Sequence, residues 1–157
     1  MVEASDIVRC PQGGLVVVNG VVLSAWTQAY DVNAVGLLEQ CVARAAQDPL
    51  GLAALGIYRV KGLREMPGSE VRTRLAALGK AHRFKVMTTV LDSSGFANAM
   101  IRLFVGGLTS LLGKDSPVAV AGSIDEGLAQ LAATGIDIEP LRPALALLTA
   151  EVFGPTS

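Results

Sequence analysis

The residues best suited to chemistry in this chain form one tetrapeptide, Asp92-Ser93-Ser94-Gly95. It follows an apolar, strand-like run and precedes a predicted helix, whose free backbone amides would favour phosphate or another anion. Phosphorylation of Ser93 or Ser94 would place about two negative charges at this point. The same residues also suit an ordinary turn and helix cap, because Asp and Ser accept backbone hydrogen bonds and Gly permits a sharp turn. The tetrapeptide is therefore a candidate phosphorylation or anion site, with a structural role as the alternative.

The sequence contains no complete catalytic or cofactor-binding motif. Gly113-Lys114 resembles the end of a phosphate-binding loop, but Leu108 stands where that loop needs a glycine and Asp115 where it needs Ser or Thr. His82 is the single histidine, which leaves a catalytic triad or a metal site with too few residues. No dinucleotide-binding glycine pattern follows the first strands. We therefore expect a protein that is not an enzyme and that has no cofactor and no metal.

Strands and helices must alternate to position the tetrapeptide. Two apolar runs, Leu15–Val18 and Val21–Trp26, flank Asn19-Gly20, and both of these residues tolerate positive φ. The pair therefore predicts a β-hairpin with a type I′ turn. Strand-like and helical stretches then alternate, which predicts an α/β domain with a mixed, mainly parallel sheet of about five strands. Four core helices are expected, with an extra C-terminal helix outside the core, and residues 1–13 are a lead-in that contributes at most a short strand.

The expected elements after the hairpin follow from apolar spacing and capping residues. A first helix capped by Asp31 or Asn33 ends before Asp48-Pro49. Further strands are expected at 53–60, 84–91 and 117–121, and further helices at 69–82 (capped by Ser69), 96–112, 124–133 (capped by Ser123) and 140–153. Residues 1–135 are expected to form one domain. Residues 136–157 are expected to be a C-terminal helical extension packed on that domain or on a partner.

The composition is apolar for a chain without an expected membrane span. Of the 157 residues, 51% are hydrophobic and 17% charged, against a usual charged fraction of about 25%. No apolar run reaches the roughly 20 residues that span a bilayer, and the first 15 residues carry Glu3 and Asp6 and lack a signal-peptide core. Cys10 and Cys41 form no pair motif, as is typical of reduced thiols. We expect a cytoplasmic protein with either a deep core or an apolar face that something else covers.

Basic residues concentrate in one part of the chain. Eight of the 13 Lys and Arg residues lie between positions 59 and 85, opposed there only by Glu65 and Glu70. This stretch could attract an acidic partner, phosphates or a membrane surface through peripheral contact, or it could be a solvated helix face. No aromatic residues alternate with the charges, so nucleic-acid binding is not expected. The candidate basic docking face comprises Arg64, Arg72, Arg74, Lys80 and Arg83.

Two apolar helical segments predict self-association. The segment 96–112 is apolar on nearly every side, although a helix on a sheet needs an apolar stripe only about 100° wide. A two-fold homodimer would bury this surplus together with a second stripe near the C-terminus. Alternatively, the C-terminal helix folds back over Phe104 of the same chain and leaves a monomer. The candidate interface comprises Phe96, Met100, Phe104, Leu108, Leu141, Leu145, Leu148 and Val152.

From residue 15 to about 134 the chain resembles the STAS family, the sulfate-transporter and anti-sigma-factor antagonist domains. The order of elements and the string Asp92-Ser93-Ser94-Gly95 carry the resemblance. In STAS antagonists the phosphorylation loop follows the third strand, whereas here the string follows the fourth, so the family's phosphoserine has no matching position. The pattern is closer to a divergent bacterial branch, the small STAS/CRAL-TRIO-like proteins, in which a long apolar helix follows the fourth strand. The resemblance implies a STAS-like fold and a non-enzymatic function.

Three functions are compatible with the sequence. The first is a cytoplasmic regulatory or scaffolding module that acts through protein–protein interaction, with itself, with another cytosolic protein, or with both. The second is an apolar-ligand or lipid-binding domain, which the CRAL-TRIO similarity permits. The third is a phosphorylation-controlled switch at Ser93 or Ser94.

Overall fold

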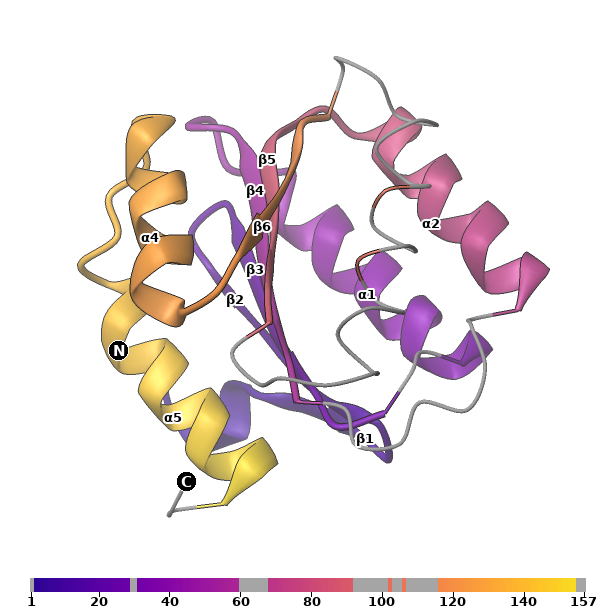
Figure 1. Ribbon diagram of the computed structural model, residues 1–157, viewed down its shortest axis with the longest axis horizontal. Helices are drawn as coiled ribbons and strands as arrows, with labels where there is room; N and C mark the ends of the chain where they lie inside the picture. The colour runs from indigo at the N-terminus through magenta and orange to yellow at the C-terminus, as the bar shows by residue number, and fades with distance from the viewer. Residues whose placement is uncertain are drawn as a thin grey trace.

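The computed structural model describes residues 2–28, 31–59, 68–91, 102, 106 and 116–154. These residues form one six-stranded sheet, of order β1-β2-β3-β4-β5-β6, with helices on both faces (Figure 1). The strands are β1 (Val8–Cys10), β2 (Gly13–Val18), β3 (Val21–Trp26), β4 (Leu52–Tyr58), β5 (Phe84–Val90) and β6 (Val118–Ala121). The helices are η1 (Ala4–Asp6, a 3₁₀ turn), α1 (Val32–Ala45), α2 (Ser69–Ala81), α4 (Ile124–Ala133) and α5 (Leu141–Phe153).

The sheet is mainly parallel and begins antiparallel. β1, β2 and β3 pair antiparallel, whereas β3, β4, β5 and β6 pair parallel. This confirms the predicted α/β class and the opening hairpin. The sheet has six strands instead of about five, because the lead-in supplies β1, which pairs Val8 with Leu15.

The hairpin turn forms at Asn19-Gly20, but the predicted type I′ turn is wrong at its second residue. Asn19 has a φ of 54°, whereas Gly20 does not adopt the positive φ that a type I′ turn requires there. Gly20 is needed for a different reason, since a Cβ at this position would lie 2.0 Å from the carbonyl oxygen of Gly51. The Gly20 carbonyl also accepts a 2.9 Å hydrogen bond from the amide of Ala53. The turn is therefore packed tightly against the start of β4.

One face of the sheet carries α1 and α2. The Asp31 side chain caps α1 by accepting a 2.8 Å hydrogen bond from the amide of Ala34, as predicted. The apolar side of α1 packs on β2 and β3, and α2 packs mainly on α1. The cap of α2 is Gly68, so the prediction of Ser69 as the cap is wrong by one residue. Gly68 has no side chain to satisfy the first amides of the helix, and its carbonyl accepts from the amide of Arg72.

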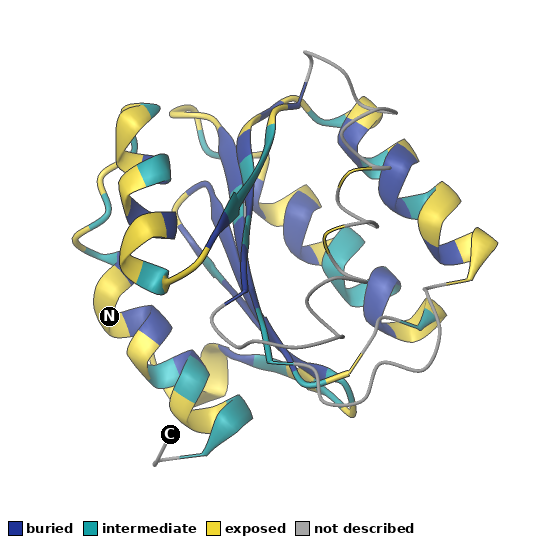
Figure 2. Cartoon of the chain, in the orientation of Figure 1, coloured by how far each residue is buried: buried dark blue, intermediate teal, exposed yellow. Residues whose placement is uncertain are grey.

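The opposite face carries α4 and α5, and among the described residues it holds the larger cluster of buried side chains (Figure 2). Ser123 caps α4 as predicted, accepting a 3.1 Å hydrogen bond from the amide of Glu126. α4 covers β5 and β6, while α5 covers β2 and β3. The expectation that the C-terminal helix lies outside the core is wrong, because Leu141, Leu145 and Leu148 are buried in the same cluster as the central strands.

The end of α5 is held by polar as well as apolar contacts. Arg9 donates a 2.9 Å hydrogen bond to the carbonyl oxygen of Glu151 and lies 3.6 Å from its carboxylate. The guanidinium of Arg59 lies 4.5 Å from the centre of the Phe153 ring, within the range of a cation–π contact. These contacts join the last turn of α5 to β1 and to the residue that follows β4.

Candidate functional site

Several of the predicted site residues lie outside the described residues. They are the candidate phosphorylation or anion site Asp92, Ser93, Ser94 and Gly95, the first half of the candidate interface, Phe96, Met100, Phe104 and Leu108, and one member of the basic face, Arg64.

The second half of the candidate interface faces the chain's own sheet. Leu141, Leu145 and Leu148 are at most 2% exposed, and they pack against β2 and β3. Val152 is half-buried on the same cluster, and its Cγ2 lies 3.1 Å from the point where a Cβ of Gly14 would stand. Leu141, Leu145 and Leu148 are therefore unavailable to a second subunit, whereas the predicted alternative contact with Phe104 lies outside the described residues.

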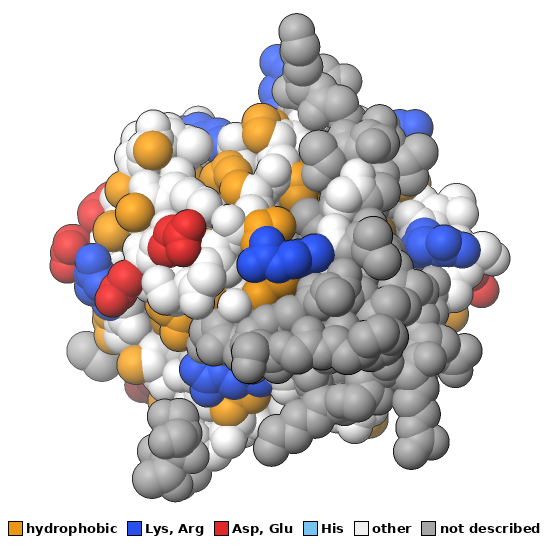
Figure 3. All heavy atoms as spheres, viewed as in Figure 1, with side chains coloured by type: hydrophobic (Ala, Val, Ile, Leu, Met, Phe, Trp, Pro, Cys, Tyr) orange, Lys and Arg blue, Asp and Glu red, His pale blue; other side chains and the backbone are white. Residues whose placement is uncertain are grey.

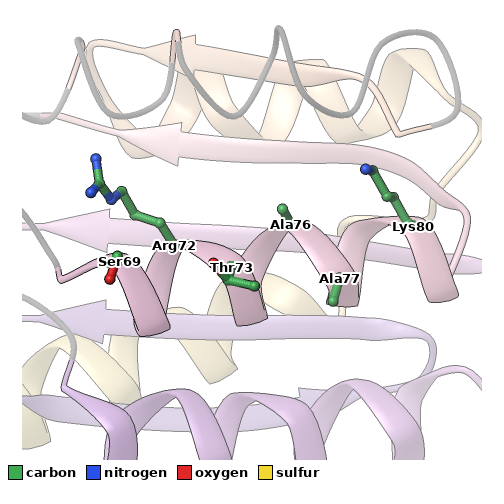
Figure 4. A pocket seen from close by; sticks show the side chains of 6 residues that line it. All are labelled: Ser69, Arg72, Thr73, Ala76, Ala77 and Lys80. Atoms are coloured by element: carbon green, nitrogen blue, oxygen red, sulfur yellow. The ribbon is translucent and has the colours of Figure 1, made fainter.

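Two exposed members of the predicted basic face, Arg72 and Lys80, lie along α2. Six residues of this helix line a hollow of about 510 Å³, which we call the α2 groove (Figure 4). Arg72 and Lys80 project from the same side of the helix as Ala76, one cation at each end (Figure 4). The described lining of the α2 groove consists of Ser69, Arg72, Thr73, Ala76, Ala77 and Lys80.

The packing of α2 fixes which side of the helix lines the groove. Val71 and Leu75 are buried against Val35, with Leu38 packed alongside, so this stripe is turned toward α1. Residues three or four positions apart lie on one face of a helix, which places the groove-lining residues on a neighbouring stripe. The described groove side chains between the two cations are small. Thr73 and Ala77 are exposed, and Ala76 is buried.

The cations of α2 differ in whether they form an ion pair with another described residue. Arg74 forms a bidentate pair with Glu39 of α1, through its Nε at 3.2 Å and through its Nη2. Hydrogen bonding from Arg74 holds the pKa of Glu39 below its ordinary value, partly opposed by desolvation. Arg72 and Lys80 are exposed, and neither forms an ion pair with any other described residue. Of the predicted basic face, Arg72 and Lys80 therefore line the groove, Arg74 is committed to α1, and Arg83 lies beyond the end of α2.

Small and hydroxyl-bearing side chains lie on the α1/α2 face of the sheet. Strand register places Ser24, Gly56, Thr89 and Val120 in one row across β3 to β6. A Cβ at Gly56 would lie 3.0 Å from the Ser24 hydroxyl oxygen and 3.5 Å from that of Tyr58. The Tyr58 ring keeps some exposed surface, but its hydroxyl is enclosed by protein and burial raises its pKa. Neighbouring apolar side chains remain half-exposed, namely Ala54, Met87, Val118 and Val120.

A second, smaller hollow of about 340 Å³ lies between α4 and α5. Leu128 and Leu145 contribute its apolar part, and Arg142 and Asp125 contribute charges. The Arg142 guanidinium lies 3.6 Å from the Asp125 carboxylate and 3.7 Å from that of Glu139. One guanidinium is therefore shared by two carboxylates here, whereas Arg72 and Lys80 of the α2 groove form no ion pair with a described residue.

Comparisons of the chain with family models, with curated proteins and with solved structures gave no match. Within the described parts of the chain, no helix is long and apolar enough to cross a membrane. No group of three or more His, Cys, Asp or Glu side chains in those parts could hold a metal ion. The sequence indicated a basic stretch between 59 and 85 but not the groove, although Arg72, Ala76 and Lys80 recur at four-residue spacing within it.

Proposed function

We propose that this protein is a cytoplasmic, non-enzymatic interaction module with a STAS-like fold, which binds an acidic helical segment of a partner protein in the α2 groove. One observation carries the proposal: a hollow along a helix, with small residues in its middle and at each end a cation that forms no ion pair with a described residue. Neither cation stabilises another described element, so a role outside the chain accounts for their positions best.

The dimensions of the α2 groove suit a helix. Arg72 and Lys80 are eight residues apart, which is about 12 Å along the axis at a rise of 1.5 Å per residue. Thr73 and Ala77 are the exposed groove residues between them, and small side chains allow the axis of a second helix to approach within about 8–10 Å. Two carboxylates eight residues apart on the partner would then meet both cations.

The two cations contribute in different ways. A guanidinium binds a carboxylate through two parallel hydrogen bonds and so fixes its orientation, whereas an ammonium acts as a mobile point charge. Arg72 would therefore set the register of the bound helix, and Lys80 would add attraction with less directional preference. Because both groups are exposed, salt should weaken binding, and the attraction should raise the association rate more than the final affinity.

A synthetic helical peptide tests this function. It carries two glutamates eight residues apart with alanines between them on the same face, and its control peptide has glutamine at both positions. The glutamate peptide should bind with an affinity that falls as salt rises, and the glutamine peptide should bind more weakly. The double variant Arg72→Glu/Lys80→Glu should abolish the preference.

A matched variant separates the groove from total charge. Arg44→Glu/Lys85→Glu changes the net charge by the same amount at two exposed positions outside the groove. This control should bind the glutamate peptide as the unmodified chain does. Equal loss of binding in both double variants, or no preference between the two peptides, would contradict the proposed site.

The sheet residues support a second candidate function, the binding of an apolar ligand. Ala54, Met87 and Val118 form an adjacent half-exposed row on the α1/α2 face, next to the row that contains Ser24 and Gly56. Ligand sites are typically apolar with a few polar groups that orient the ligand, and these rows have that composition. Native mass spectrometry of the purified chain tests this candidate, since a bound lipid would appear as an added mass and an unmodified mass would contradict it.

A further inference from the structure

Acidic side chains gather on the opposite side of the molecule from the α2 groove. α2 and α4 lie on opposite faces of the sheet, and the acidic side chains in view cluster over the α4 side (Figures 1 and 3). Asp125 lies in the first turn of α4, and Asp137 and Glu139 lie between α4 and α5. We call Asp125, Asp137 and Glu139 the acidic patch.

The acidic patch is open to a partner. The side chains of Asp125 and Glu139 are 91% and 77% exposed, although both approach Arg142. One guanidinium that lies near two carboxylates leaves a net negative charge, and Asp137 adds to it. Within the patch, the Asp137 carboxylate also accepts a 3.1 Å hydrogen bond from the amide of Glu139.

We propose that the acidic patch of one copy of this chain occupies the α2 groove of the next copy. This inference rests on the proposed function, because it names the partner for the same groove. Charge complementarity carries it: Arg72 and Lys80 have no ion pair with a described residue, while Asp125 and Glu139 share one cation. Asp125 in the first turn of α4 and Glu139 in the segment before α5 supply the two carboxylates, so the patch meets the groove through the end of a helix and not along its length.

The positions of the two surfaces determine the kind of assembly. A two-fold dimer would have to bury both surfaces of each copy in one interface, and surfaces on opposite faces of the sheet cannot meet that condition. The contact is therefore head-to-tail and repeats from copy to copy, into a closed ring or an open chain. Arg142 on the patch and Glu70 beside the groove weaken the attraction, so assembly should require low salt and high protein concentration.

Sedimentation velocity of two charge-reversed variants tests the inference. The groove variant is Arg72→Glu/Lys80→Glu, and the patch variant is Asp125→Lys/Glu139→Lys. At low salt, the average mass of the unmodified chain should rise with concentration to about twice the monomer mass or beyond, and each variant alone should stay monomeric. An equimolar mixture should associate again into dimers or larger species, because the patch variant retains its basic groove and the groove variant retains its acidic patch. The two reversed surfaces also attract each other. If the patch variant does not fold, Asp125→Asn/Glu139→Gln replaces it in the same mixture.

The outcomes separate this inference from the proposed function. An unmodified chain that stays monomeric at every concentration, or a mixture that forms no dimer, would overturn head-to-tail assembly. If the glutamate peptide still binds the groove in that case, the proposed function stands without self-assembly. If neither the peptide nor a second copy binds, both proposals fail.

Discussion

Replacing Leu148 by alanine tests whether α5 belongs to the core of its own chain. Leu148 is fully buried against the sheet. Leu→Ala removes three carbon atoms, which is about 2.4 kcal/mol at about 0.8 kcal/mol per buried methylene, before the cavity left behind is counted. With the cavity included, the loss of unfolding free energy should be about 3–4 kcal/mol, within the range for buried leucines.

Urea unfolding measures this loss directly. With a slope of about 2 kcal/mol per molar urea, the midpoint should fall by about 1.5–2 M. Leu147→Ala is the matched control, because it makes the same change one residue earlier on a side chain that is only partly buried. Leu147→Ala should lower the midpoint clearly less. Equal and small losses for both variants, or a Leu148→Ala chain whose association state changes while its stability does not, would refute the assignment of α5 to the core.

Three further predictions follow from single contacts. The pKa of Glu39 is lowered in the folded chain, so its pair with Arg74 stabilises the fold above the ordinary carboxyl pKa, and this stability is lost as pH falls through the folded pKa. Glu39→Gln should therefore make the unfolding free energy depend less on pH below about pH 4.3. The same pH dependence in both chains would contradict this. Gly20→Ala should lower the melting temperature more than Gly68→Ala. A Cβ at Gly20 would lie 2.0 Å from a carbonyl oxygen, whereas a Cβ at Gly68 would meet nothing within 4 Å. Equal melting temperatures of the two variants would contradict the close approach at Gly20. Burial raises the pKa of the Cys41 thiol, partly opposed by the charge of Arg44, so a thiol reagent should modify Cys41 more slowly than Cys10 in the native chain and at the same rate in denaturant.

The sequence predicted the order of elements well because local chemistry determines much of it. Asp31 and Ser123 cap their helices as expected, since a capping side chain needs only amides two or three residues away. Asn19-Gly20 marked the hairpin for a similar reason. The type of turn was not predictable, because the geometry at Gly20 depends on its contact with Gly51, thirty-one residues along the chain.

Tertiary packing determines the features of the fold and of the candidate site that the sequence alone did not predict. The leucines of α5 form an apolar stripe that fits either a partner or the chain's own sheet, and periodicity alone does not distinguish the two. The ion pairs of the charged residues also depend on tertiary packing. Arg74 and Arg72 are two positions apart in one basic stretch, yet only the placement of α1 commits Arg74 to Glu39 and leaves Arg72 open.

Amide chemical-shift mapping tests the docking role of the α2 groove most directly. The isotope-labelled chain is titrated with the synthetic helix that carries two glutamates eight residues apart, and the glutamine version is the control. The account predicts that the largest shifts fall on residues 69–80, that they saturate, and that they shrink as salt rises. Shifts concentrated on α4 or α5, or equal shifts with both peptides, would contradict it.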